Sequence, residues 1–304
     1  MTRLCGTLAA ESPRRGILYA LSAAVLFGAS APFAKSLLGT ASPQGMAGLL
    51  YVGSGIGMAL VRALRPGERA DTLKKKDLPW LSGSVLAGGA AAPILLMNAL
   101  QRMPASEASL LLNLEAVFTA LIAWLLFKEK FSARVGMGLI IVIAGGILLG
   151  WHGSTRLSEG WGPALVAGAC VAWGFDNNFM ERISRSDALQ IAMIKGLVAG
   201  SVNILIALAL DATWPSASKL GLAATLGFFG YGISLVLVVM ALRRIGATRT
   251  IAAFSMAPFV GTIVGVAVFG EPLTWLLAAS GALMALGVAI TATAPRDQKI
   301  APAS

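Results

Sequence analysis

Apolar stretches long enough to cross a lipid bilayer recur along nearly the whole of this 304-residue chain. A helix rises about 1.5 Å per residue, so about 20 apolar residues cross a hydrocarbon core that is about 30 Å thick. Inside that core, only helices and closed barrels satisfy their own backbone hydrogen bonds. Charged residues make up 12% of the chain, against about 25% in soluble domains. The sequence therefore predicts an all-α membrane protein.

We expect ten transmembrane helices. Their boundaries fall where turn-forming pairs interrupt the apolar pattern, as at Ser42-Pro43 and Met103-Pro104. The loops between them are short, and no soluble domain fits anywhere in the chain. The expected spans are 16–38, 44–64, 78–101, 105–127, 132–151, 160–183, 186–210, 219–242, 247–269 and 272–294.

Lysine and arginine predict which side of the membrane each loop occupies. If the N-terminus is cytoplasmic, 19 of the 24 Lys and Arg residues fall in cytoplasmic segments, four fall in outer segments, and Lys195 lies inside a helix. This bias predicts cytoplasmic tails at both ends, residues 1–15 and 295–304. It also explains the net charge of +10 without a nucleic-acid partner.

The first helix follows Arg14 and Arg15 and is expected to be retained. Its start resembles a signal peptide, but Pro32 follows the candidate cleavage site and disfavours processing. Cys5 and Cys170 lie far apart in the sequence, so no disulfide is predicted.

The chain resembles itself when it is shifted by 146 residues in its first part and by 142 residues later. The first shift places Phe27-Gly28-Ala29-Ser30 on Trp173-Gly174-Phe175-Asp176. The second places Phe127-Lys128-Glu129 on Phe269-Gly270-Glu271. We therefore expect two five-helix repeats, residues 16–151 and 160–294. Because five is an odd number, the second repeat is inverted relative to the first, as in many secondary transporters.

Two segments carry a resemblance to a known family. They run from Asn113–Ala120 through Phe127-Lys128-Glu129, and from Met256–Phe259 through Phe269-Gly270-Glu271-Pro272. Both resemble an apolar helix of the EamA branch of the drug/metabolite transporter (DMT) superfamily, and the resemblance covers residues 16–294. It implies a ten-helix carrier. It also implies that a bacterial member of this size exports amino acids or related metabolites, as the YddG-type aromatic amino-acid exporters do.

Three backbone features carry expectations of their own. Ala116 stands where the second half has Pro258, so a kink is predicted less strongly in the first half. Glu129 and Glu271 lie at helix junctions, where each is expected to cap the N-terminus of the next helix. The segment 88–93, Gly-Gly-Ala-Ala-Ala-Pro, predicts a loosened helix centre that exposes backbone groups to a cavity.

The candidate transport site centres on polar residues at membrane depth. Trp173, Asp176 and Asn177 recur at helical spacing and share one face, which offers an aromatic wall, a carboxylate and an amide to a small zwitterion. Glu115 and Tyr231 are expected near the bilayer midplane and could face them. Ionisable residues at this depth are costly and mark function by default.

Lys195 lies at a depth similar to that of Asp176 on the next, antiparallel helix, so the two could form an ion pair or a gate. Structural interpretations remain open for the same residues. The pair could serve packing alone, Glu115 could clamp neighbouring helices, and Trp173 and Tyr231 could be core residues.

Together these features predict a multi-pass secondary transporter of the bacterial inner membrane. It would move small metabolites outward by alternating access. The expected substrates are amino acids, aromatic ones among them. Export of drugs or other metabolites is the alternative. A channel is disfavoured because the repeats differ at key places, Ser30 against Asp176 and Leu49 against Lys195.

Other classes of protein are disfavoured on specific grounds. The single histidine and the lack of a nucleophile–base pair argue against an enzyme. The chain has no phosphate-binding loop for ATP, and no cofactor or metal is predicted. The expected partners are the lipid bilayer, a small-molecule substrate and protons, which could couple through Glu115 or Asp176. The oligomeric state stays open.

Overall fold

The computed structural model describes residues 13–39, 41–64, 72–129, 132–151, 161–184 and 186–293. Regular structure in these ranges is helical, with no strand among them, which confirms the all-α class. Eight helical segments are long and apolar enough to cross a membrane. They are Arg14–Leu38, Pro43–Leu64, Lys75–Leu100, Ala105–Phe127, Ala133–Gly150, Ala188–Ala209, Ala217–Ala241 and Trp275–Ala292.

The first half contains three uninterrupted helices and two that change form along their length. Its elements are α1 (Pro13–Leu38), α2 (Pro43–Leu64), a 3₁₀ turn η1 (Lys75–Asp77), α3 (Leu78–Ser84), a π-helix η2 (Val85–Ala91), α4 (Ala92–Leu100), α5 (Ala105–Leu111), α6 (Leu114–Phe127) and α7 (Ala133–Trp151). The second half contains α8 (Trp161–Ile183), α9 (Ala188–Ala209), α10 (Ala217–Gly227), a π-helix η3 (Phe228–Ile233), α11 (Ser234–Phe254), α12 (Ala257–Ala267) and α13 (Trp275–Ala292).

Two of the expected spans fall outside the set of eight. Helix α8 is long enough at 23 residues, but Asp176, Asn177 and Asn178 lower its hydropathy. The segment Ala252–Ala267 is apolar but short. The first of these spans contains the polar residues of α8, and the second contains the helix interruption at Ser255 and Met256.

The expected boundary between spans 219–242 and 247–269 does not coincide with a break in the helix, because α11 continues through it to Phe254. The helix is interrupted instead at Ser255 and Met256, just before Pro258, which has no backbone N–H to continue the hydrogen-bond ladder. The chain still reverses within α11. The Phe27 ring lies 5.7 Å from that of Tyr231 and 5.6 Å from that of Phe254, whereas a straight helix would separate those two residues by about 34 Å.

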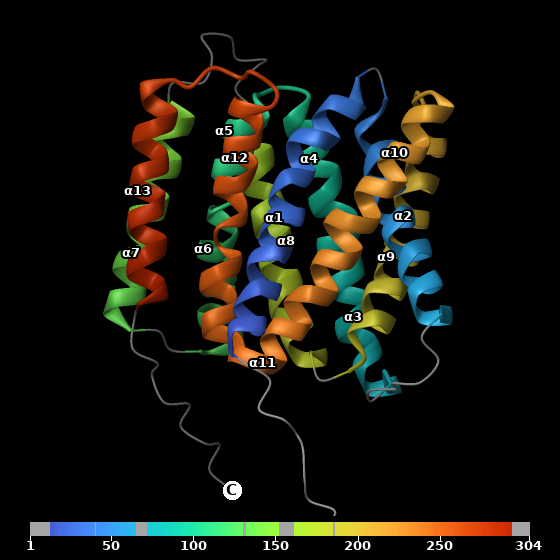
Figure 1. The fold of residues 1–304 in the computed structure, drawn as a ribbon, viewed down its shortest axis with the longest axis horizontal. Coiled ribbons are helices and arrows are strands. Elements are labelled where there is room, and N and C mark those ends of the chain that lie inside the picture. Colours follow the sequence, from blue (N-terminus) through green and yellow to red (C-terminus); the bar gives the residue numbers. More distant parts are fainter. Residues whose placement is uncertain are drawn as a thin grey trace, which may run out of the picture.

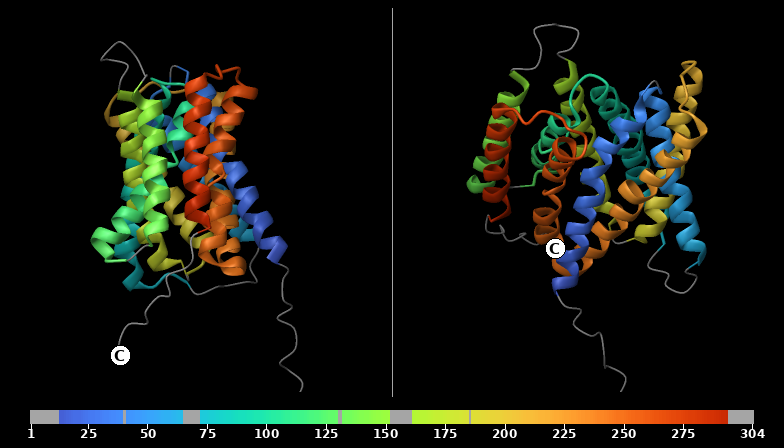
Figure 2. Two further views of the ribbon diagram at one scale, coloured as in Figure 1. Left: turned by 90° about the vertical axis from the view of Figure 1, so that its left-hand side faces the viewer. Right: turned by 45° about the horizontal axis from the view of Figure 1, so that its top comes forward.

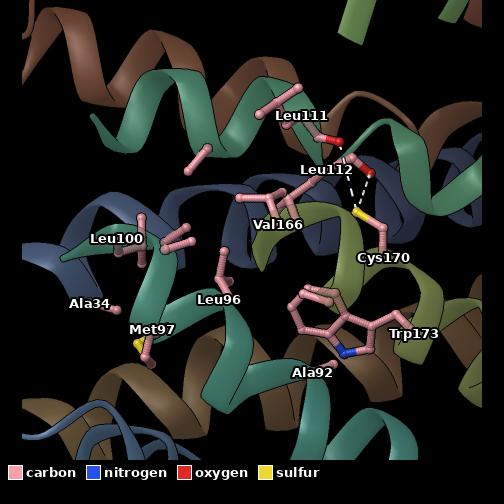
Figure 3. Close-up of a cluster of buried hydrophobic side chains, with 14 of the residues drawn as sticks. Ala34, Ala92, Leu96, Met97, Leu100, Leu111, Leu112, Val166, Cys170 and Trp173 are labelled. Atoms are coloured by element: carbon pink, nitrogen blue, oxygen red, sulfur yellow. Dashed lines mark hydrogen bonds between the residues drawn. The ribbon is translucent and has the colours of Figure 1, made fainter. Parts of the chain in front are cut away.

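The first half is interrupted at the corresponding place, Leu112 and Asn113, although it has no proline there. The expectation of a weaker kink in the first half, based on Ala116 in place of a proline, is therefore wrong. The side-chain amide of Asn113 donates to the carbonyl of Leu110 at 2.8 Å and so competes with the helix backbone. The thiol of Cys170, on α8, lies 3.8 Å from the carbonyl oxygen of Leu111 and 4.0 Å from that of Leu112 (Figure 3).

Helices from the two halves pack against each other in matched pairs (Figure 1). Helix α1 packs on α11 and α12, and α8 packs on α3, α4 and α6. Helix α2 packs along α9, and α7 along α13. The α7–α13 pair forms one edge of the bundle, and α2 and α10 lie at the opposite edge (Figures 1 and 2).

Close contacts at glycines recur at positions related by the two sequence shifts. A Cβ at Gly16 would meet Ile245, and one at Gly162 would meet Met103. Gly28 in α1 likewise packs on Ala257 of α12, and Gly174 in α8 packs on α6. Because lipid is as apolar as a protein core, such close van der Waals contact is a main source of stability within a membrane.

Candidate functional site

The π-helix η2 releases backbone carbonyls into the centre of the bundle. The wider turn of a π-helix changes which N–H each carbonyl meets, and such turns are frequent at functional sites. The carbonyl of Gly88 accepts hydrogen bonds from the Tyr51 hydroxyl at 2.7 Å and the Trp173 indole N–H at 3.2 Å. The Asn203 amide donates to the carbonyl of Gly89 at 3.0 Å. The loosened centre expected at 88–93 is therefore present.

Asp176 and Lys195 lie beside this turn and form an ion pair. Lys195 Nζ is 2.5 Å from Asp176 Oδ2, and the Ser84 hydroxyl donates to Asp176 Oδ1 at 2.5 Å. The side chains are only 7% and 8% exposed. Each charge is thus compensated within the protein, which lowers the free-energy cost of burying it.

Gly88 permits this arrangement because it has no side chain. A Cβ at Gly88 would overlap the Asp176 carboxylate. The 142-residue shift pairs Gly88 with Gly230, and a Cβ there would lie 2.8 Å from the Cβ of Ser30. The same backbone approach thus occurs in both halves, with a carboxylate in one and a hydroxyl in the other.

Aromatic side chains enclose the other side of the site. The Phe27 ring lies 6.2 Å from the Trp173 ring and 5.7 Å from the Tyr231 ring, both edge-to-face. Tyr51 and Tyr231 are 5.2 Å apart. Trp173, Tyr51 and Tyr231 are buried. Trp173 and Tyr231 are thus brought together through Phe27.

Glu115 and Asn177 form a second polar group between α6 and α8. The Asn177 amide donates to Glu115 Oε1 at 2.8 Å and to the Thr119 hydroxyl at 3.1 Å. Asn177 is exposed and Glu115 partly exposed. Within the described ranges, no hydrogen bond or ion pair joins Glu115 to Asp176 or Lys195. The predicted residues therefore divide into a buried pair and an accessible pair.

Sequence reasoning missed several residues of this centre. Tyr51, Ser84 and Asn203 each donate a hydrogen bond at the site but are uncharged, so the cost of burying them gave a weaker signal. The sequence indicates Gly88 only as part of the loosened segment 88–93. Asn203 lies two turns beyond Lys195 on α9, and that spacing is the signal that could have found it.

A separate apolar groove of about 400 Å³ lies between α5, α6, α7 and α8. Its wall includes Leu114, Phe118, Ile143 and Pro163, and none of the predicted site residues lines it. Among the described residues, no group of three or more His, Cys, Asp or Glu side chains could hold a metal ion.

Comparisons with known proteins agree with this architecture. The sequence model of the EamA-like transporter family matches residues 14–151 and again 160–293. An "Uncharacterized transporter" of Methanothermobacter thermautotrophicus is 29% identical over 90% of this chain and 85% of its own length. "Uncharacterized transporter YyaM" of Bacillus subtilis is 21% identical over 88% of this chain and 90% of its own length.

Two further similarities are more limited. The "Probable 4-amino-4-deoxy-L-arabinose-phosphoundecaprenol flippase subunit ArnE" of Erwinia tasmaniensis is 37% identical over 73 residues. That alignment covers 24% of this chain and 67% of the relative's own length. A solved structure titled "Crystal structure of protein" superposes with a TM-score of 0.69 at 20% identity, covering 90% of this chain and 94% of that one. At that identity, the second similarity concerns the fold alone.

Proposed function

The chain belongs to the EamA-like transporter family, and on that premise we propose that it is a secondary transporter that exports amino acids or closely related amines by alternating access. We place it in the inner membrane of a bacterium. Membership of a transporter family, rather than a family of enzymes, is consistent with the multi-pass helical fold.

We further propose ten transmembrane spans arranged as two inverted repeats, with both termini cytoplasmic. The pairing of α1 with α11 against α8 with α3 and α4 supports a two-fold relation between the halves. So do the π-helices η2 and η3, which lie at shift-related positions. The excess of cytoplasmic Lys and Arg supports the orientation.

The observation that carries the substrate proposal is the hydrogen bond between Glu115 and Asn177. Asp176 is already neutralised by Lys195, so it is not free to bind a charged ligand. Glu115 has no cation within ion-pair distance among the described residues, and its partner Asn177 is exposed. A carboxylate at membrane depth without a cation favours a ligand that brings one. The α-ammonium group of an amino acid has that chemistry.

The aromatic side chains support an aromatic substrate. Trp173, one turn from Asn177 on α8, packs edge-to-face with Phe27, and such walls favour ring-bearing ligands by aromatic contact. The amino sugar in the name of the ArnE relatives gives further support for a ligand that carries an amine.

Competition for transport into proteoliposomes tests this assignment. Uptake of labelled phenylalanine should be inhibited by phenethylamine, which keeps the amine, and far less by 3-phenylpropionate, which keeps only the carboxylate. Glu115→Gln should abolish that preference, whereas Glu181→Gln, at the end of the same helix as Asn177, should leave it unchanged. Equal inhibition by both analogues in the unaltered protein would refute the amine assignment.

Export of hydrophobic drugs or lipid-linked metabolites is the second candidate. The apolar groove between α6, α7 and α8 favours it, because a hydrocarbon chain could enter there from the bilayer. Inhibition of phenylalanine uptake by hydrophobic cations larger than phenethylamine, at lower concentrations than phenethylamine requires, would favour this candidate.

A further inference from the structure

Glu271 follows the end of α12, yet its carboxylate binds the opposite half of the chain. Oε1 accepts a hydrogen bond from the backbone N–H of Ala105 at 2.8 Å, and Oε2 accepts one from Ser106 at 2.6 Å. Lys35 of α1 lies 3.2 Å from Oε1 and donates to the carbonyl of Met103 at 2.8 Å. Glu271 therefore joins the start of α5 to α1 and to the connection between α12 and α13.

This geometry corrects the expectation that Glu271 caps the helix that follows it. That helix, α13, is capped by Thr274, whose hydroxyl accepts from the backbone N–H of Leu277 at 3.1 Å. Because a local residue already fills that role, the Glu271 carboxylate is free to cap α5 across the interface between the halves.

Small residues hold α12 against α5 on the same side of the bundle. A Cβ added to Gly261 would meet Ser109, and one added to Gly265 would meet Ser106. The Thr262 hydroxyl donates to the carbonyl of Ser106 at 3.0 Å. Ser106 and Ser109 are each 1% exposed, so the contact between α12 and α5 is closely packed.

Aromatic rings add a further contact next to Glu271. Phe33 of α1 and Phe269 pack edge-to-face with ring centroids 5.2 Å apart. Both rings remain partly exposed, at 41% and 38%, so they cover the edge of the contact rather than its interior.

The 142-residue shift pairs Glu271 with Glu129, and the backbone before each is the same. Lys128 and Gly270 both adopt left-handed conformations, with φ of 55° and 67°. The backbone N–H of Glu129 donates to the carbonyl of Ala123 at 3.0 Å, and the backbone N–H of Glu271 donates to the carbonyl of Gly265 at 3.1 Å.

The two carboxylates nevertheless differ in their surroundings. Glu129 is exposed, and within the described ranges its carboxylate has no hydrogen bond or ion pair. Helix α6, which precedes Glu129, packs on α8 and α7. One member of the pair is thus engaged across the halves, and the other is not.

We propose that Glu271 and Glu129 are reciprocal latches, of which Glu271 closes the outer side in this state. In the opposite state α11, which is continuous here, would break near residue 247. Glu129 would then bind the backbone N–H groups freed at 247–248, which the same shift pairs with those of Ala105 and Ser106, and close the cytoplasmic side. The proposal rests on the inverted repeat and alternating access proposed above. It accounts for the exposure of Asn177, in the cytoplasmic half of α8, while Ser109 on the outer side is buried.

Thiol labelling tests the latch without any substrate. A Cys5→Ser background carries Ser109→Cys as an outer reporter or Asn177→Cys as a cytoplasmic reporter, and the native buried Cys170 provides the blank. A membrane-impermeant maleimide is added from one side of oriented vesicles. Glu271→Gln removes charge-assisted hydrogen bonds, so it should raise outer labelling about tenfold and lower cytoplasmic labelling. Lys35→Met should act in the same direction but less.

Glu129→Gln is the matched control, and it should not raise outer labelling. Unchanged outer labelling in Glu271→Gln would overturn the proposal. So would a rise at both reporters, since that indicates general loosening rather than a change of state. If phenylalanine transport fails while labelling shifts reciprocally, the latch stands and the proposed substrate falls.

Discussion

The buried pair of Asp176 and Lys195 permits a quantitative prediction. At an N–O distance of 2.5 Å, two unit charges in an effective dielectric of about 20 attract by about 7 kcal/mol. Desolvation offsets most of that attraction, but removing one partner leaves the other charge buried. Lys195→Met and Asp176→Asn should therefore each lower the free energy of unfolding by about 3–5 kcal/mol.

The double variant distinguishes a true pair from two unrelated residues. Asp176→Asn with Lys195→Met removes both charges, so its stability should return to within about 2 kcal/mol of the unaltered protein. The resulting coupling energy should be about 3 kcal/mol or more. The assay is unfolding by sodium dodecyl sulfate in mixed micelles, followed by circular dichroism.

Arg62 and Asp187 provide the matched control pair. They also form an ion pair, but with side chains 30% and 13% exposed it is more solvated than the Asp176–Lys195 pair, so its coupling energy should be the smaller of the two. Additive losses at Asp176 and Lys195, or a coupling no larger than that of the control pair, would refute the reasoning. The Asp176–Lys195 pair would then contribute no more to the free energy of unfolding than the control pair does.

Three further predictions follow from the backbone and from Glu271. Gly88→Ala should abolish folding or transport, because the added Cβ overlaps the Asp176 carboxylate. Gly221→Ala, whose Cβ meets nothing within 4 Å, should change neither. Expression yields and size-exclusion profiles of the two variants check this prediction, and equal behaviour of the two variants would contradict it. Lys128→Gly should stabilise the protein by about 1 kcal/mol, because glycine adopts the left-handed backbone at that position without strain, and Gly270→Ala should destabilise it by a similar amount. Unfolding in mixed micelles measures both changes. Changes of the opposite sign would show that backbone strain is not the cause. Burial alone raises the pKa of Glu271, but hydrogen bonds from Ser106 and Ala105 and the charge of Lys35 together lower it below 4.5. A lowered pKa means that the contribution of Glu271 is fully present above the ordinary value and lost only as pH falls through the lowered one. Outer labelling at Ser109→Cys, corrected for thiol reactivity, should thus stay constant between about pH 6 and 8; a rise within that range would contradict the capped, ionised carboxylate.

Much of the fold follows from patterns that act locally. Apolar length predicts helices, and a carboxylate at the same depth as a lysine on the next helix predicts their pairing, since neither charge is tolerated alone. The break at Met256 follows from Pro258. The equivalent break at Asn113 was underestimated because it depends on a side-chain amide and on Cys170, a contact made only after α8 packs.

The rest of the site depends on contacts between distant segments. Tyr51 reaches the Gly88 carbonyl only because α2 and η2 are neighbours in the folded chain. Glu271 was expected to cap the next helix because sequence rules consider adjacent elements first. Its actual partners, Ala105 and Ser106, lie more than 160 residues away, and no local pattern indicates them.

Substrate counterflow in proteoliposomes tests the central claim, alternating access, most directly. Vesicles loaded with unlabelled phenylalanine are diluted into labelled phenylalanine, and internal label is followed over time. A carrier that exposes its site to one side at a time should accumulate label transiently above the external concentration, and protein-free vesicles should not. A rise to equilibrium without any overshoot, at a rate independent of the internal phenylalanine, would contradict alternating access and indicate a channel.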